Sequence, residues 1–197
     1  MKNKILFAAL FISCVLFCCK KDSEKGSPEA PFGIEMIFST GGTVIIREGT
    51  AGGVNSYGRA GGLINTAGNY FEIQSTAFSG NGAKLTIYFM KKFPAQPDSS
   101  VIESIFHTGN YPFGGSVIDS LKDGAETIFD AANGTRWSSA YGFQSGSFSV
   151  TEHVPNDFDN FTPFMTSGTF SCTLYDTAGN TLQVNAATFK GRTVVYP

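Results

Sequence analysis

Apolar and polar side chains alternate with a period of two along much of the chain beyond residue 32. In the first half the pattern runs through residues 34–38 and 43–47, and again through 70–74 and 84–89. Short segments rich in glycine separate the two members of each pair, Ser39 to Gly42 in the first and Gly80 to Gly82 in the second. Period-two alternation on both sides of a turn predicts β-hairpins in which each strand has one apolar face.

The pattern returns in the second half of the chain. Strands are predicted at residues 126–129 and 135–139, with the turn-forming pair Asn133-Gly134 between them. A further strand is predicted at residues 147–151.

The C-terminal part has the clearest alternation. Phe170, Cys172 and Leu174 alternate with polar residues, residues 176–180 form a turn, and the chain returns through Leu182, Val184 and Ala186. We expect these two triplets to be the buried faces of a hairpin. A last strand is predicted at residues 193–196.

Four segments lack this pattern. Residues 49–69 are glycine-rich and predict a long loop with at most one short strand, and the acidic residues 152–163 predict a second loop. Ser100 and Glu103 resemble a capping box, which predicts one or two helical turns over 101–107, and another short helix is predicted at 116–122.

About eight to ten strands, each with one apolar face, need a cover that the few helical turns are too short to provide. The sequence therefore predicts an all-β fold, an antiparallel β-sandwich of immunoglobulin-like or jelly-roll-like type, as a single domain over residues 32–197. The composition agrees, with 19 Phe, 7 Tyr and 23 Gly but only 15% charged residues.

The N-terminus has a different pattern. Lys2 and Lys4 precede an apolar run over residues 5–17, which ends at Cys18-Cys19 and a charged segment. A basic start and a short apolar run predict a secretory signal peptide, residues 1–18. With Leu16 at position −3, the segment resembles the lipobox of bacterial lipoproteins, although Phe17 departs from its pattern.

The lipobox resemblance implies that the Cys19 thiol receives a diacylglyceryl group and becomes an acylated mature N-terminus, with palmitate as one of its acyl chains. Cys18 fits the pattern less well, and the alternative is an ordinary signal peptide or an uncleaved anchor. Residues 19–31 are polar with two prolines and predict a flexible tether. The expected location is the outer membrane of a Gram-negative cell, on its periplasmic or cell-surface face.

Two segments carry a second resemblance. Trp137-Ser138-Ser139 with Gln144 and Phe148, and Phe189 with Gly191-Arg192, are similar to the C-terminal half of small uncharacterised Bacteroidetes lipoproteins. This resemblance implies a lipid anchor and a β-sandwich, and it implies no activity.

Charge and cysteine content argue against a nucleic-acid partner and against a disulfide bond. Without Lys2 and Lys4, 12 of the 14 basic residues remain against 16 acidic ones, a formal charge of −4. This excess of negative charge argues against nucleic acid as a partner. Beyond Cys19 the mature chain has only Cys172, so no intramolecular disulfide is expected, and its place in an alternating strand predicts a buried free thiol.

Catalytic or metal-binding patterns are weak. His107 and His153 lack the spacing of a zinc site, and His153 is expected at the surface near a strand end. Asp157 and Asp159 suit a solvated acidic turn better than a calcium loop, and no G-x-S-x-G motif is present. We therefore predict no catalytic residue, no metal and no cofactor.

Aromatic residues near turns are the remaining candidates for function. Trp137, Tyr141 and Tyr111 are predicted as ligand contacts, with core packing as the alternative for Trp137. The leading hypothesis is a non-enzymatic binding module for a glycan, a peptide or an envelope protein. The alternatives are a surface hydrolase without a recognisable motif and a purely structural accessory subunit.

Overall fold

The computed structural model describes residues 32–49, 52–64, 70–98, 101, 105, 107–115, 122–155 and 163–194. All of them belong to the compact unit Pro31–Pro197. The predicted signal peptide, Cys19 and the tether lie outside the described residues. So do the acidic pair Asp157 and Asp159 and most of the helical turns predicted at 101–107 and 116–122.

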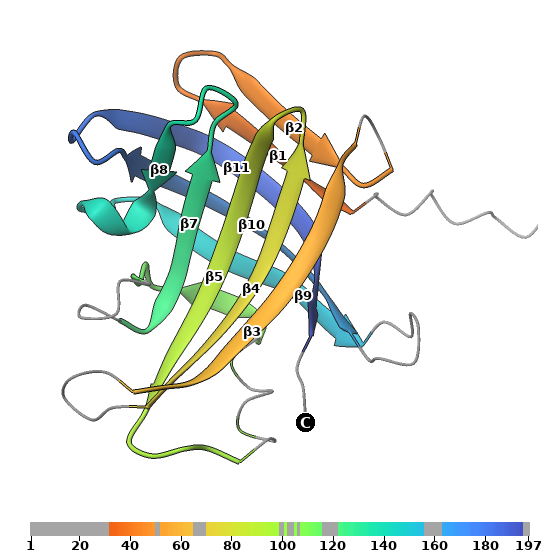
Figure 1. Cartoon of the computed structure of the whole chain (residues 1–197), viewed down its shortest axis with the longest axis vertical. Coiled ribbons are helices and arrows are strands. Elements are labelled where there is room, and N and C mark those ends of the chain that lie inside the picture. Colours follow the sequence, from red (N-terminus) through yellow and green to blue (C-terminus); the bar gives the residue numbers. More distant parts are fainter. Residues whose placement is uncertain are drawn as a thin grey trace, which may run out of the picture. The chain divides into compact units, whose positions relative to one another are not determined.

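The described part of the chain forms an antiparallel sheet of 11 strands, which confirms the all-β fold (Figure 1). The strand order is β2-β1-β11-β10-β8-β7-β5-β4-β3, with β9 paired to β10 and β6 paired to β9. The elements are β1 (Gly33–Phe38), β2 (Thr43–Arg47), β3 (Val54–Ile64), β4 (Tyr70–Gly80), β5 (Ala83–Phe93), β6 (Gly109–Tyr111), β7 (Gly124–Asp130), β8 (Arg136–Ser138), the 3-10 turn η2 (Ser139–Tyr141), β9 (Ser147–Pro155), β10 (Pro163–Tyr175) and β11 (Thr181–Val194).

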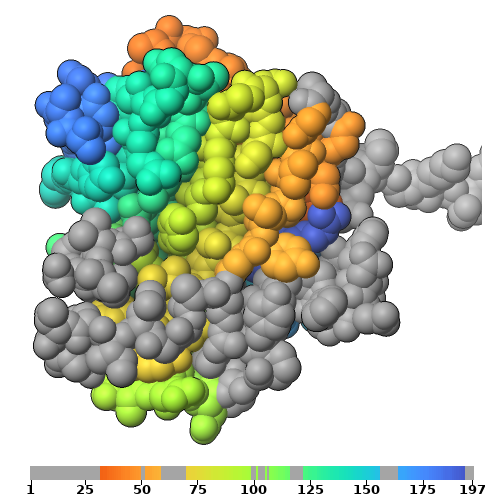
Figure 2. Space-filling view, in the orientation of Figure 1, coloured from red at the N-terminus to blue at the C-terminus, as the bar shows by residue number. Residues whose placement is uncertain are grey.

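The sheet folds over itself into a barrel-like sandwich with two layers. Strands β3, β4, β5, β7 and β8 form one layer, whose outer surface is the face seen in Figure 2. Strands β2, β1, β11, β10 and β9 form the other. The layers are continuous at one seam, where Tyr175 of β10 pairs with Ser138 of β8.

Asn55 links the two layers on the other side. Its Nδ2 donates to Thr76 Oγ1 at 3.0 Å within its own layer, and its Oδ1 accepts from the backbone N of Arg192 on β11 at 2.7 Å. Since Asn55 is buried, these hydrogen bonds replace the backbone ladder that β3 and β11 do not form.

Four predicted hairpins are confirmed: β1–β2, β4–β5, β7–β8 and β10–β11. The turn between β4 and β5 shows the local cause. Asn81 and Gly82 have φ angles of 54° and 76°, the left-handed conformation that asparagine and glycine tolerate best.

The prediction of a long loop with at most one short strand over residues 49–69 is wrong, because the long strand β3 occupies much of this segment. Val54 to Ile64 pair with β4 in a long ladder, with a bulge between Ala60 and Leu63. Backbone hydrogen bonds stabilise this strand at the edge of the sheet, so it does not need an alternating pattern. A Cβ on Gly58 would lie 3.2 Å from Ser75 Oγ, so glycine allows this close approach.

The prediction for the C-terminal part, residues 170–196, is partly wrong. A bulge in β11 opposite Phe170 and Cys172 shifts the phase by one residue, so Ala187 is buried and Ala186 is exposed. The strand then continues without a break to Val194, in place of a separate strand from 193. Two boundaries also differ: β9 extends to Pro155 within the predicted loop, and Ser139 begins η2 instead of ending a strand.

Apolar side chains from both layers meet in one half of the interior, which we call the apolar half. Its fully buried members include Met36, Leu85, Leu174 and Val184. Cys172 lies among them as a buried free thiol, as predicted. Burial raises the pKa of this thiol to about 12, so it stays protonated and unreactive at neutral pH.

Candidate functional site

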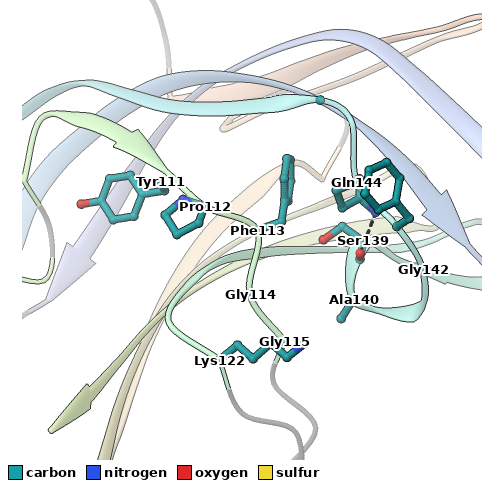
Figure 3. Close-up of a pocket in the computed structure, with 12 residues that line it drawn as sticks. Tyr111, Pro112, Phe113, Gly114, Gly115, Lys122, Ser139, Ala140, Gly142 and Gln144 are labelled. Atoms are coloured by element: carbon teal, nitrogen blue, oxygen red, sulfur yellow. Dashed lines mark hydrogen bonds between the residues drawn. The ribbon is translucent and has the colours of Figure 1, made fainter.

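A pocket of about 570 Å³ opens beside β6 and η2 (Figure 3). We call it the η2 pocket. This volume lies within the range of small-molecule sites in proteins. The residues that line it are Tyr111, Pro112, Phe113, Gly114, Gly115, Lys122, Ser139, Ala140, Gly142, Phe143, Gln144 and Gly146.

One wall is the segment that follows β6. Its backbone is fixed to β7, because Pro112 O accepts from Ala125 N and Gly114 N donates to Ala125 O, both at 2.9 Å. A Cβ on Gly114 would lie only 2.5 Å from Lys122 O, so glycine permits this close contact. The wall is therefore backbone-rich and held in place.

The opposite wall, residues 139–146, is fixed to β10. Gln144 Nε2 donates to Ser139 O at 2.7 Å (Figure 3). It also donates to Thr173 O at 2.6 Å, and Gln144 Oε1 accepts from Thr173 N at 3.0 Å. The hydroxyl of Tyr175 donates to Phe143 O at 2.7 Å. These hydrogen bonds tie the wall to β10 at two points.

Phe143 is the most unusual residue of this wall. Its side chain is 83% exposed although its backbone is clamped to β10, and Tyr141, two residues earlier, is 44% exposed. A large apolar ring that an ordered segment presents to solvent is a common feature of binding surfaces.

The structure brings two of the three predicted contact residues to this region. Tyr111 lines the pocket, and Tyr141 lies in η2 between the lining residues Ala140 and Gly142. The Tyr111 hydroxyl donates to Ile105 O at 2.7 Å, and burial raises its pKa to about 12, so it remains neutral. Trp137 lies elsewhere: it packs against the apolar half from β8, opposite Phe129, which favours its core-packing alternative.

Sequence reasoning missed Phe143 and Gln144. A signal was present, because Phe143 lies in Gly142-Phe-Gln-Ser-Gly146, where two nearby glycines and no alternation make a core strand improbable. The role of Gln144 depends on contacts with Thr173, which lies 29 residues further along the chain.

The described lining residues include no Asp, Glu, His or Cys, and Lys122 carries their one charge at neutral pH. The Ser139 hydroxyl is occupied, since it accepts from Thr127 N at 2.9 Å. The pocket therefore presents aromatic rings, glycine backbone and one ammonium group, a set that suits binding by shape and stacking.

The expectation that His153 lies at the surface near a strand end is wrong in part, because its side chain is half-buried. A bulge in β9 after Val150 turns His153 inward, where its ring stacks on Phe164 at 4.4 Å and its Nδ1 lies 3.0 Å from Thr166 Oγ1. Burial, with a smaller contribution from His107, lowers the pKa of His153 to about 4. The imidazole is therefore neutral at pH 7.

Across the described residues, no three His, Cys, Asp or Glu side chains gather as a metal site would need. No helix among the same residues has the length and apolar character to span a membrane. No known protein family, curated protein or solved structure matches this chain. The geometry of the site is therefore the basis for inferring a function.

Proposed function

We propose that this protein is a lipid-anchored envelope lipoprotein that binds a glycan in the η2 pocket without transforming it. The observation that carries the proposal is Phe143, whose exposed ring stands on a segment clamped to β10. Exposure of an apolar ring to water is unfavourable. A ligand that covers the Phe143 ring would therefore gain about 2 kcal/mol of binding free energy.

The chemistry of the walls favours a sugar. The face of an aromatic ring stacks on the apolar face of a pyranose, and the exposed Phe143 ring offers such a face at the pocket. The Lys122 ammonium supplies donors for hydroxyl groups or for the carboxylate of an acidic sugar.

The lining of this pocket favours binding without catalysis over a hydrolase. Hydrolysis of a glycosidic bond normally uses a pair of carboxylates, and peptide hydrolysis uses a nucleophile with a base or a metal. The described lining residues include no carboxylate, His or Cys, and the hydroxyl of the one lining serine, Ser139, accepts from Thr127 N. No particular contact favours the hydrolase or the purely structural subunit.

The decisive experiment compares Phe143→Ala with the wild-type protein on a glycan array. We expect at least about tenfold weaker binding, the equivalent of 1.4 kcal/mol, with an unchanged melting temperature. Tyr57→Ala is the matched control, because Tyr57 is also exposed but lies on β3, outside the pocket. Equal binding by wild type and Phe143→Ala, or capture of a peptide or protein in place of a glycan, would contradict the proposal.

The anchor is tested separately. Cys19→Ser should abolish incorporation of labelled palmitate and leave the precursor uncut, whereas Cys18→Ser should still be labelled. The reason is that acylation needs the thiol of the residue that becomes the mature N-terminus, and durable anchoring needs at least two acyl chains. Labelling of Cys19→Ser at the wild-type level would refute the assignment.

A further inference from the structure

A second group of polar residues lies inside the sandwich, on the inner face of β4, which contributes nothing to the η2 pocket. Glu72, Gln74 and Thr76 alternate along β4, and each is at most 1% exposed. The register places Gln74 opposite Phe89 and Thr76 opposite Ile87, two members of the apolar core. The three polar side chains therefore share the inward face of the sheet.

The other layer also has polar side chains where it faces this part of β4. A Cβ on Gly191 of β11 would lie 2.5 Å from Thr76 Oγ1, so β11 lies directly on β4. From Gly191, β11 continues to Thr193, and from Thr76, β4 leads back to Gln74. The buried hydroxyls of Thr193 and Thr166 lie 2.8 Å apart. We call this region the polar half of the interior.

Gln74 is the unusual member. Among the described residues, neither its Oε1 nor its Nε2 has a hydrogen-bond partner, and the same holds for the Thr127 hydroxyl on β7. A buried amide without partners is costly, and native proteins rarely keep one. Gln74 needs an acceptor for its N–H and a donor for its C=O, and a hydroxyl group supplies both.

The surroundings narrow the ligand class. The Phe89 ring lies beside Gln74 and packs on Tyr111 with 5.2 Å between ring centroids, so an aromatic surface adjoins the free amide. The carboxyl group of Glu72 accepts from the Tyr70 hydroxyl at 3.4 Å, so this face also presents hydrogen-bond acceptors and favours a ligand with donor groups. Neutral ligands with both hydroxyl groups and an apolar face fit these conditions.

We propose that the polar half of the interior binds a small neutral polyol or monosaccharide, with Gln74 as the hydrogen-bonding anchor and Phe89 as the apolar surface. This site is separate from the η2 pocket, and it stands or falls independently of the function proposed above.

The test is titration of the full mature protein with glucose, N-acetylglucosamine and xylitol, followed by calorimetry and ligand-observed NMR. We expect one of the three to bind the wild type, and Gln74→Leu to weaken that binding at least about tenfold through loss of the amide hydrogen bonds. Phe143→Ala should leave this binding unchanged, which separates the site from the η2 pocket.

Three results would overturn the proposal: no binding of any of the three compounds, equal binding by Gln74→Leu, or binding that Phe143→Ala abolishes. If Gln74→Leu does not fold, a crystal of the wild-type protein soaked in the compound that binds decides the matter. Density for that compound on the Gln74 amide supports the site, and density for water alone refutes it.

Discussion

The two halves of the interior are made by the same strands and differ in chemistry. On β10 the inward residues change from Leu174, Cys172 and Phe170 to Thr166, and on β11 they change from Val184 and its apolar successors to Thr193. The apolar half buries side chains that need no specific partner. The polar half connects its side chains by hydrogen bonds and leaves the Gln74 amide without one.

This difference separates two tasks within one sheet. Apolar burial supplies about 1.5–3 kcal/mol for each large side chain, whereas a hydrogen bond contributes about 1 kcal/mol net. The apolar half therefore supplies most of the stability. The polar half contributes less stability, and its donors and acceptors give it the means to recognise a ligand.

The largest effect is expected from Phe148→Ala. Phe148 is buried and packs on Phe89, Phe170 and Phe189, with the Phe170 ring stacked at 5.6 Å. Loss of this ring should lower the free energy of unfolding by about 3–5 kcal/mol because it leaves a cavity. Urea denaturation followed by far-UV circular dichroism measures the change, with exposed Phe143→Ala as control. A loss no larger than that of the control would refute the division into two halves.

Cys172→Ser should have the next largest effect. It places a hydroxyl group in the apolar half, where the neighbours are apolar, and we expect a loss of about 1–3 kcal/mol. The same urea titration measures it. Cys172→Ala serves as the control for lost volume, and a serine variant as stable as the alanine variant would show that this half tolerates polar groups.

Thr166→Val is the converse change in the polar half. It removes the hydroxyl that links His153 to Thr193, at 3.0 Å and 2.8 Å, and we expect a loss of about 1–2 kcal/mol. Thr169→Val is the matched control, since Thr169 is exposed on the same strand. If both variants are equally stable, the hydrogen-bonded connection contributes nothing.

The smallest effect is the pH dependence. In the folded state the pKa of His153 is lowered to about 4, so between pH 6.5 and 4 the unfolded chain binds a proton that the folded chain does not. Stability should therefore be complete above pH 6.5 and fall as the pH drops, by about 1 kcal/mol after allowance for partial exposure. Thermal unfolding at several pH values measures this fall, and His153→Gln should reduce it. An unchanged pH profile in that variant would exclude His153 as the cause.

The sequence predicts the apolar half far better than the polar half. Phe170, Cys172 and Leu174 are visible as an alternating pattern because burial alone selects apolar residues at every second position. Gln74 and Thr166 occupy the same inward positions with polar side chains, so the pattern hides their burial. His153 is hidden in another way, because a bulge reverses its direction.

The η2 pocket was predictable only in part. Tyr111 and Tyr141 stand out as aromatic residues near turns, whereas the wall that holds Phe143 depends on hydrogen bonds from Gln144 and Tyr175 to residues distant in the sequence. Local patterns carry no information on such pairings. The long edge strand β3 was missed for the same reason, since its partner β4 defines it.

The seam between the layers has a kinetic consequence. Tyr175 and Ser138 form the one residue pair that joins β10 to β8, while ladders of many pairs hold each layer together. Local opening costs less where fewer backbone hydrogen bonds break, so amide hydrogens near the Tyr175–Ser138 pair should exchange with deuterium before those inside the long ladders. Because the wall of the η2 pocket begins at Ser139, right after this pair, opening at the seam should also loosen that wall.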